Sequence, residues 1–93
     1  MKEEKSIVRS DRAGVFYGIV TARRGAEVDL KDVRRIYYWS GATDCIQIAQ
    51  EGCSPKSRLT MAADSITILG VIEVLPVSEK ARVILDGIPA WKM

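Results

Sequence analysis

The sequence predicts an α+β fold, in which an antiparallel sheet of about five or six strands carries two short helices packed on it. Runs rich in β-branched and aromatic residues fill most of residues 6–39 and return after residue 58. Two other segments place apolar residues at helical spacing between capping residues. We expect one globular domain over residues 1–93, because this length suits a single core and 47% of the residues are apolar.

The first forty or so residues are predicted to form an antiparallel meander. Strands are expected at 6–10, 15–22, 26–30 and 33–39. A turn-prone segment at 11–14 separates the first two strands, and Gly18 suggests a bulge inside the second. Arg23-Arg24-Gly25 is expected to form a hairpin turn, since glycine accepts a positive φ angle. Lys31-Asp32 indicates a break before the last of these strands.

After Ser40 the apolar period changes to that of a helix. Ser40 or Thr43 can cap this helix, with Asp44 in its first turn, and Gly52 is suited to end it. Residues 46–48 also alternate, so a strand stays open as the alternative. The apolar residues on the expected helical face are Cys45, Ile48 and Ala49.

Strands are expected again at 58–62 and 66–75. The second of these is apolar on both faces, which is typical of a central strand or of one covered by a helix or a partner chain. Ser78 is then expected to cap a final short helix that ends at Gly87. Its buried stripe is expected to consist of Ala81, Ile84 and Leu85.

The composition argues against an enzyme, a metal site and a cofactor. The chain has no histidine, which removes the commonest general base and most zinc sites. Cys45 and Cys53 have no further cysteine to complete a metal site, and we interpret them as reduced thiols. Glu73 stands alone in an apolar strand and is expected to face solvent. A net charge of +2 does not by itself indicate nucleic-acid binding.

We expect a cytoplasmic protein that does not enter membranes. The charged start of the chain is unlike a signal peptide, and no apolar run reaches the roughly 20 residues of a membrane-spanning helix. A domain of this size buries a modest share of its surface, so we also expect a homo-oligomer.

The most informative stretch is the aromatic strand at 33–39, which combines two arginines with three aromatic rings. The period of a strand places Arg35, Tyr37 and Trp39 on one face, and it places Arg34 and Tyr38 on the other. One face is expected to be core and the other to present an arginine and a ring to a ligand. The alternative is that the rings are core and the arginines lie at the sheet margin.

Basic residues at the turns extend this hypothesis. Residues 9–39 contain seven basic and four acidic groups, which include Arg9 and Arg12 among the basic ones. An ordinary solvated face is the alternative. The candidate ligand-binding residues are Arg34, Arg35, Tyr37, Tyr38, Trp39, Arg23 and Arg24.

Two further features carry weaker expectations. The segment 40–43 lies at a strand-to-helix junction, where backbone N–H groups can meet an anion, although a plain helix start is the simpler interpretation. Trp91 near the end of the sequence is expected to dock on its own domain, with a subunit interface as the second choice.

The chain resembles a family of small phage and prophage proteins of unknown function. The resemblance rests on Ala13-Gly14-Val15-Phe16-Tyr17-Gly18, Glu27-Val28-Asp29-Leu30, Arg34-Arg35-Ile36-Tyr37-Tyr38-Trp39-Ser40-Gly41-Ala42 and Pro89-Ala90-Trp91-Lys92. It implies a mobile-element protein that works inside a bacterial cell, and it supplies no catalytic residues.

Three hypotheses about function follow. The first is a non-enzymatic binding protein that holds an anionic small molecule, nucleotide signal or nucleic-acid phosphate, in the context of counter-defence. The second is an inhibitor or adaptor of a host protein that uses the same arginines and rings as an interface. The third is a structural component of a virion.

Overall fold

The chain forms six strands and two α-helices, as seen in a computed structural model that describes residues 4–91. The strands are β1 (Ser6–Ser10), β2 (Gly14–Arg24), β3 (Glu27–Tyr38), β4 (Arg58–Leu59), β5 (Ala63–Ile68) and β6 (Val71–Pro76). The helices are α1 (Cys45–Glu51) and α2 (Glu79–Asp86). All strand pairs are antiparallel, so the predicted α+β fold is confirmed.

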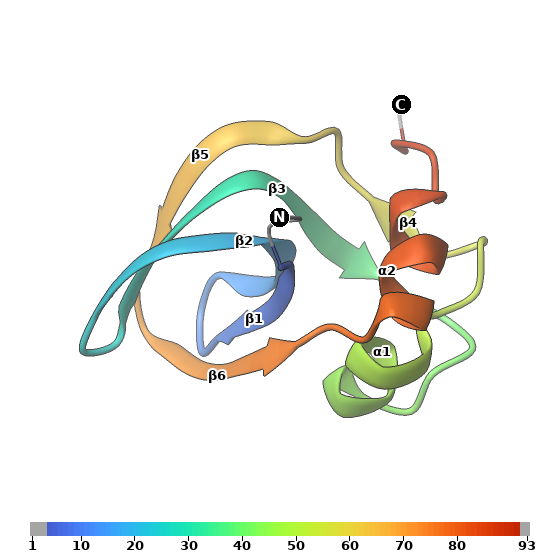
Figure 1. The fold of residues 1–93 in the computed structure, drawn as a ribbon, viewed down its shortest axis with the longest axis horizontal. Helices are drawn as coiled ribbons and strands as arrows, with labels where there is room; N and C mark the ends of the chain where they lie inside the picture. The colour runs from blue at the N-terminus through green and yellow to red at the C-terminus, as the bar shows by residue number, and fades with distance from the viewer. Residues whose placement is uncertain (1–3, 92–93) are drawn as a thin grey trace.

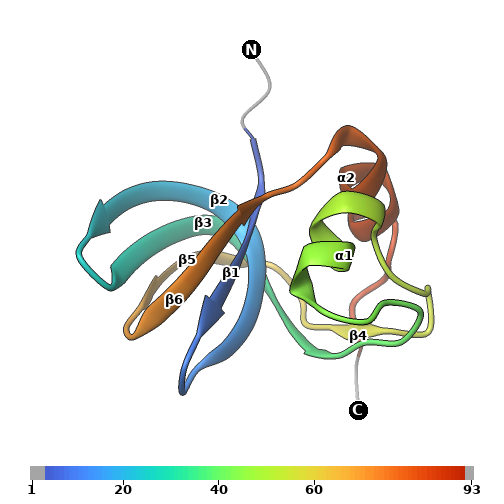
Figure 2. The same cartoon turned by 90° about the horizontal axis from the view of Figure 1, so that it is seen from below.

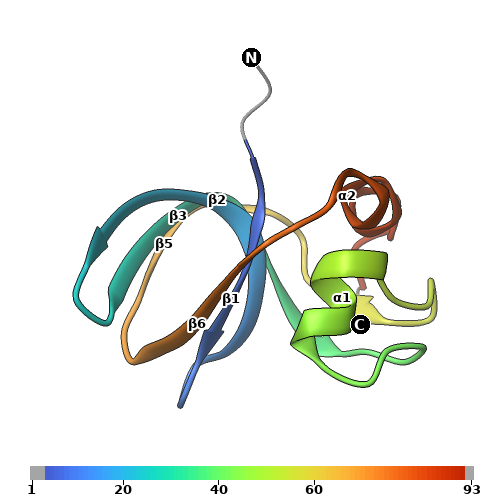
Figure 3. The same ribbon diagram turned by 60° about the horizontal axis from the view of Figure 1, so that its bottom comes forward.

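The strands form a single sheet that curls back on itself. Its order is β4-β3-β2-β1-β6, and β5 pairs with β3 on the same side as β4. A short turn joins β5 to β6, yet these two strands pair with opposite parts of the sheet, β3 and β1. The chain therefore bends round from one side of the sheet to the other (Figure 1). Both helices lie outside this curl, on one side of it (Figures 2 and 3).

Each face of the curled sheet contacts a different hydrophobic core. Neighbouring residues of one strand point to opposite cores: Ile7 and Tyr17 pack toward the helices, while Val8 and Phe16 pack inside the curl. This two-sided burial explains why β1 and β2 are apolar at successive positions. The buried residues inside the curl are Val8, Phe16, Val28, Leu30, Val33 and Ile68.

A bulge opposite Gly18 bends β2 and β3. Tyr17 pairs with Arg34 and Ile19 with Lys31, so Gly18 faces two residues of β3, one of which is Asp32 with φ of 47°. The irregularity predicted at Gly18 is present, but the extra residue belongs to β3 and not to the strand that contains Gly18. The predicted break at Lys31-Asp32 is this bulge, and the two strands expected on either side of it are one continuous strand.

The strand expected at 66–75 is divided in the structure. Gly70 adopts a φ of 68°, which favours glycine, and the chain turns there between β5 and β6. Leu69 in this turn is 64% exposed and Ile72 of β6 is 53% exposed. The prediction of one central strand was therefore wrong, because apolar residues alone did not reveal the turn. The strand expected at 58–62 is shorter, since β4 covers only Arg58–Leu59.

The helix boundaries largely follow the predicted caps. The Asp44 side chain accepts a hydrogen bond of 3.1 Å from the Gln47 N–H, so Asp44 is the N-cap of α1 in place of the expected Ser40 or Thr43. The alternative of a strand at 46–48 is excluded. Ser78 caps α2 as expected, accepting from the Ala81 N–H at 3.1 Å. Gly52 and Gly87 follow the two helices, as predicted.

Asp86 at the end of α2 ties the helix to the sheet. Its carboxylate accepts hydrogen bonds from the Tyr17 hydroxyl at 2.7 Å and from Lys5 Nζ at 2.9 Å. Arg82 donates to the second carboxylate oxygen at 3.0 Å. Partial burial opposes ionisation, but the donors from Lys5 and Tyr17 outweigh it and lower the pKa of Asp86.

Replacement of Gly18 by alanine is expected to destabilise the protein by about 1–3 kcal/mol. An added Cβ would lie 2.8 Å from Val33 Cβ and 2.9 Å from its Cα, so the two strands would have to separate. Gly87→Ala is the matched control, because its nearest contacts would be 3.4 Å and its φ of −81° suits alanine. Urea denaturation measures both variants, and equal losses of stability would contradict this account of the bulge.

Replacement of Asp86 by asparagine is expected to lower the free energy of unfolding by about 1–3 kcal/mol at neutral pH. Because the pKa of Asp86 is lower in the folded state, its contribution is present above about pH 4 and is lost as the pH falls through the folded value. Urea denaturation at neutral and acidic pH should therefore show a smaller pH dependence for Asp86→Asn than for the wild type. Asp64→Asn, at an exposed position of β5, should keep the wild-type pH dependence.

Candidate ligand pocket

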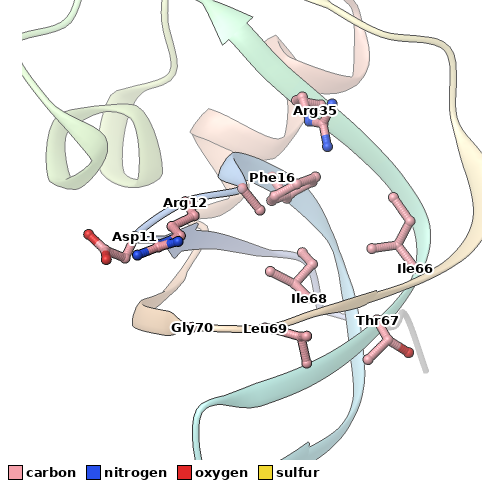
Figure 4. Close-up of a pocket in the computed structure, with 10 residues that line it drawn as sticks. Asp11, Arg12, Phe16, Arg35, Ile66, Thr67, Ile68, Leu69 and Gly70 are labelled. Atoms are coloured by element: carbon pink, nitrogen blue, oxygen red, sulfur yellow. The ribbon is translucent and has the colours of Figure 1, made fainter.

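A cavity of about 660 Å³ lies at the mouth of the curled sheet. Its walls come from the β1–β2 turn, from β2 and β3, and from β5 with the turn that follows it. Most of its lining is apolar. Phe16 forms one wall, and Ile66 and Ile68 extend from β5 on the other side (Figure 4).

Arg35 places a positive charge in this pocket. It projects from β3 toward the ring of Phe16, with its guanidinium carbon 5.0 Å from the ring centroid (Figure 4). Among residues 4–91, no carboxylate forms an ion pair with Arg35. Its guanidinium donors are therefore open to an anionic ligand.

The β1–β2 turn adds Arg12 and Asp11 to the pocket wall. The backbone N–H of Asp11 donates to the carbonyl of Gly70 at 3.0 Å, which joins this turn to the turn between β5 and β6. Arg12, like Arg35, has no carboxylate partner in the part of the chain that the structure describes. The pocket thus contains two guanidinium groups and one carboxylate, a net positive charge.

Arg34 lies on the opposite face of β3 from Arg35, as the period of a strand predicts. Its Nε donates to the carbonyl of Thr60 at 2.8 Å, and its Nη1 donates to the carbonyl of Leu85 at 3.2 Å. Burial lowers the pKa of this guanidinium. Arg34 therefore connects β3 to the end of α2 and does not reach the pocket.

The rings of the aromatic strand do not line the pocket either. Tyr37 is 46% exposed. It has no pairing partner in β4, because Ile36 pairs with Leu59 and Tyr38 pairs with the adjacent Arg58. Trp39 lies beyond the end of β3 and packs against the helix-side core. The expected common face of Arg35, Tyr37 and Trp39 was thus wrong for Trp39, since the strand and its alternation end at Tyr38.

The arginines of the β2–β3 hairpin lie outside the pocket. Arg24 is paired with the carboxylates of Glu27 and Asp29, and hydrogen bonds from Arg24 and Thr67 lower the pKa of Asp29. Arg23 is exposed. Arg9 likewise forms an ion pair with Glu73 at 3.0 Å, so Glu73 lies at the surface with a partner.

Two backbone N–H groups of the segment 40–43 donate to side chains of the same chain. The Ser40 N–H donates to Ser57 Oγ at 3.1 Å, and the Thr43 N–H donates to Gln47 Oε1 at 2.8 Å. These two groups are consequently not free to meet an anion. Cys45 and Cys53 are buried free thiols, and burial raises the pKa of both.

Trp91 docks on its own chain, as predicted. The backbone N–H of Trp91 donates to the carbonyl of Leu59 at 2.9 Å, and Ala90 forms a parallel bridge with Leu59. Its ring lies over Arg58, with the guanidinium carbon 4.1 Å from the ring centroid.

Sequence analysis identified Arg35 but missed most of the pocket around it. Phe16, Ile66 and Ile68 carry no signal that separates a pocket wall from ordinary core, because all three belong to apolar strands. Arg12 is predicted only as a basic residue at a turn, and its place in the same pocket lining as Arg35 is seen only in the structure. A pocket between distant strands is a tertiary feature.

A protein-family model described as "Domain of unknown function (DUF6948)" matches residues 3–85. No curated protein and no solved structure matches the chain. Within residues 4–91, no helix has the length and apolar character needed to cross a membrane, and no three Cys, Asp or Glu residues are grouped to hold a metal ion.

The two neighbouring arginines are expected to differ in their effect on stability. Arg34→Met removes two hydrogen bonds to partly buried carbonyls and should cost about 1–3 kcal/mol. Arg35→Met removes only the contact with Phe16 and should cost less than about 1 kcal/mol. Urea denaturation of both variants makes the comparison, and an Arg35 variant that loses as much stability as the Arg34 variant would contradict the assignment.

Proposed function

Because this chain belongs to the DUF6948 family of unknown function, we propose its function from the pocket alone, as a non-enzymatic protein that binds a small nucleotide. Arg35 and Arg12 hold the phosphate, and the base lies in the apolar part of the pocket beside Phe16. The observation that carries the proposal is a guanidinium at an apolar cavity with no acidic partner among residues 4–91. Nucleotides combine an anionic group with a flat, weakly polar ring, which this lining complements.

The size of the cavity supports a small ligand. Pockets for small molecules commonly enclose about 300–1,000 Å³. A cavity of about 660 Å³ falls within this range and is suited to one nucleotide. The proposed ligand is therefore a nucleotide monomer or a compact nucleotide signal.

The pocket lining favours binding over chemistry. Asp11 is its one carboxylate, and the lining includes no lysine, cysteine or tyrosine. The hydroxyl of Thr67 donates to Asp29 at 2.7 Å and is thus already engaged. A nucleophile beside a general base, which hydrolysis by covalent catalysis needs, is not among these residues.

The resemblance to phage and prophage proteins suggests a biological setting. We propose that the protein acts in the cytoplasm of a bacterial host and sequesters a nucleotide signal of the host defence. Sequestration requires affinity and abundance but no turnover, which agrees with a small pocket that has arginines and few catalytic groups.

Native mass spectrometry of the protein purified from cells, followed by calorimetric titration with the nucleotide identified, tests the proposal. Arg12→Gln/Arg35→Gln is expected to weaken binding at least about tenfold, because each charge-assisted hydrogen bond contributes roughly 1.5–3 kcal/mol. Arg23→Gln/Lys80→Gln removes the same charge at exposed positions outside the pocket and should bind like the wild type.

The result that would overturn the proposal is equal weakening in both double variants. That outcome would assign the effect to net charge and not to the pocket. A protein that carries no nucleotide and binds none from a panel of mono- and dinucleotides would contradict the proposal as well.

A further inference from the structure

A second arrangement of arginine and aromatic rings lies on the surface near the end of the chain. Arg58 of β4 contacts two rings, with its guanidinium carbon 4.1 Å from the centroid of Trp91 and 5.7 Å from that of Tyr38. Trp91 is 47% exposed and Tyr38 is 50% exposed. None of the three residues lines the pocket described above. We refer to them as the Trp91–Arg58–Tyr38 cluster.

The fold builds this cluster from three separate segments. Tyr38 pairs with Arg58 across β3 and β4. The backbone of Trp91 is fixed by the hydrogen bond of 2.9 Å from its main-chain N–H to the carbonyl of Leu59 and by the Leu59–Ala90 bridge. Backbone hydrogen bonds thus hold both rings beside Arg58, and the cluster is preorganised before any ligand arrives.

The chain segments that carry Tyr38 and Arg58 contain basic but no acidic residues. Arg58 forms no ion pair with a carboxylate of residues 4–91. The segment 33–43, which precedes α1, and the segment 52–63, which contains β4, have no aspartate or glutamate. The second of them also carries the exposed Lys56 close to Arg58 in sequence. An anionic partner meets no repulsive carboxylate from these two segments.

We propose that the Trp91–Arg58–Tyr38 cluster binds single-stranded nucleic acid. A guanidinium beside two exposed rings complements a strand, which offers phosphates and unpaired bases. The exposed parts of Trp91 and Tyr38 are platforms on which unpaired bases stack, and Arg58 donates to the phosphate between them. This inference does not depend on the nucleotide pocket, because it uses other residues.

Duplex nucleic acid fits this geometry less well. Duplex nucleic acid keeps its bases stacked on one another, so the rings would have nothing to stack on. Neither helix offers the long basic face that reads a major groove: α1 contains no basic residue, and in α2 Arg82 is paired with Glu79 and Asp86, which leaves Lys80.

Fluorescence anisotropy with a labelled oligothymidine strand of about 20 nucleotides tests the inference, with a duplex of the same length for comparison. The wild type is expected to bind the single strand more tightly than the duplex. Trp91→Leu, which keeps an apolar side chain in place, should weaken binding roughly five- to a hundredfold, as expected for the loss of base stacking. Arg58→Gln should weaken binding too, and it should reduce the slope of log K against log salt concentration by the amount expected for about one phosphate contact.

Two controls separate this site from other effects. Lys80→Gln on α2 removes one positive charge far from β4 in sequence and should bind the strand like the wild type. The pocket variant Arg12→Gln/Arg35→Gln should also keep strand binding, so failure of the nucleotide proposal and failure of this one can be distinguished. Urea denaturation of Trp91→Leu and Arg58→Gln checks that both are folded.

Three outcomes would overturn the inference. The first is no binding of the single strand at low salt. The second is equal affinity for strand and duplex, which would indicate attraction by charge alone. The third is binding that Arg58→Gln and Trp91→Leu leave unchanged.

Discussion

The close approach of Gly18 to Val33 is the constraint on which the rest of the structure depends. A Cβ at Gly18 would lie 2.8 Å from Val33 Cβ, so only glycine lets β2 and β3 approach at the bulge. The bulge bends two long strands, and the bend allows β5 and β6 to pair with opposite parts of the sheet. Without the curl, Val8, Phe16 and Val33 would lose their common core.

Burial of both sheet faces assigns different roles to neighbouring residues. Arg34 lies on the face of β3 toward the helices, where it donates hydrogen bonds to the carbonyls of Thr60 and Leu85. Arg35 lies on the opposite face and lines the pocket. Tyr17 and Phe16 differ in the same way: the Tyr17 hydroxyl donates a hydrogen bond to Asp86, whereas Phe16 lines the pocket. Open arginines thus remain at the mouth of the curl and beside β4, the two places where we propose that anionic ligands bind.

The local elements could be predicted from the sequence, and their assembly could not. Ser78 caps α2, and Gly25 and Gly52 take the positive φ angles that favour glycine. The meander follows from runs of β-branched and aromatic residues between turns. The turn at Gly70 was missed because the apolar residues on both sides suggested one strand, whereas the two halves contact different partners. The opposite faces of Arg34 and Arg35 were predictable from the strand period, but which face was open depended on the packing of α2 and β5.

Arg34 and Arg35 differ in that Arg34 is held by carbonyls and Arg35 is open to solvent, and NMR of their Nε–H groups measures this difference. We expect the Nε–H of Arg34 to exchange slowly with solvent, because it donates to the Thr60 carbonyl at 2.8 Å, and to stay unchanged when inorganic phosphate is added. The Nε–H of Arg35 should exchange fast and shift on addition of phosphate. Slow exchange at Arg35, or a phosphate-dependent shift at Arg34 instead, would contradict the assignment of these two residues.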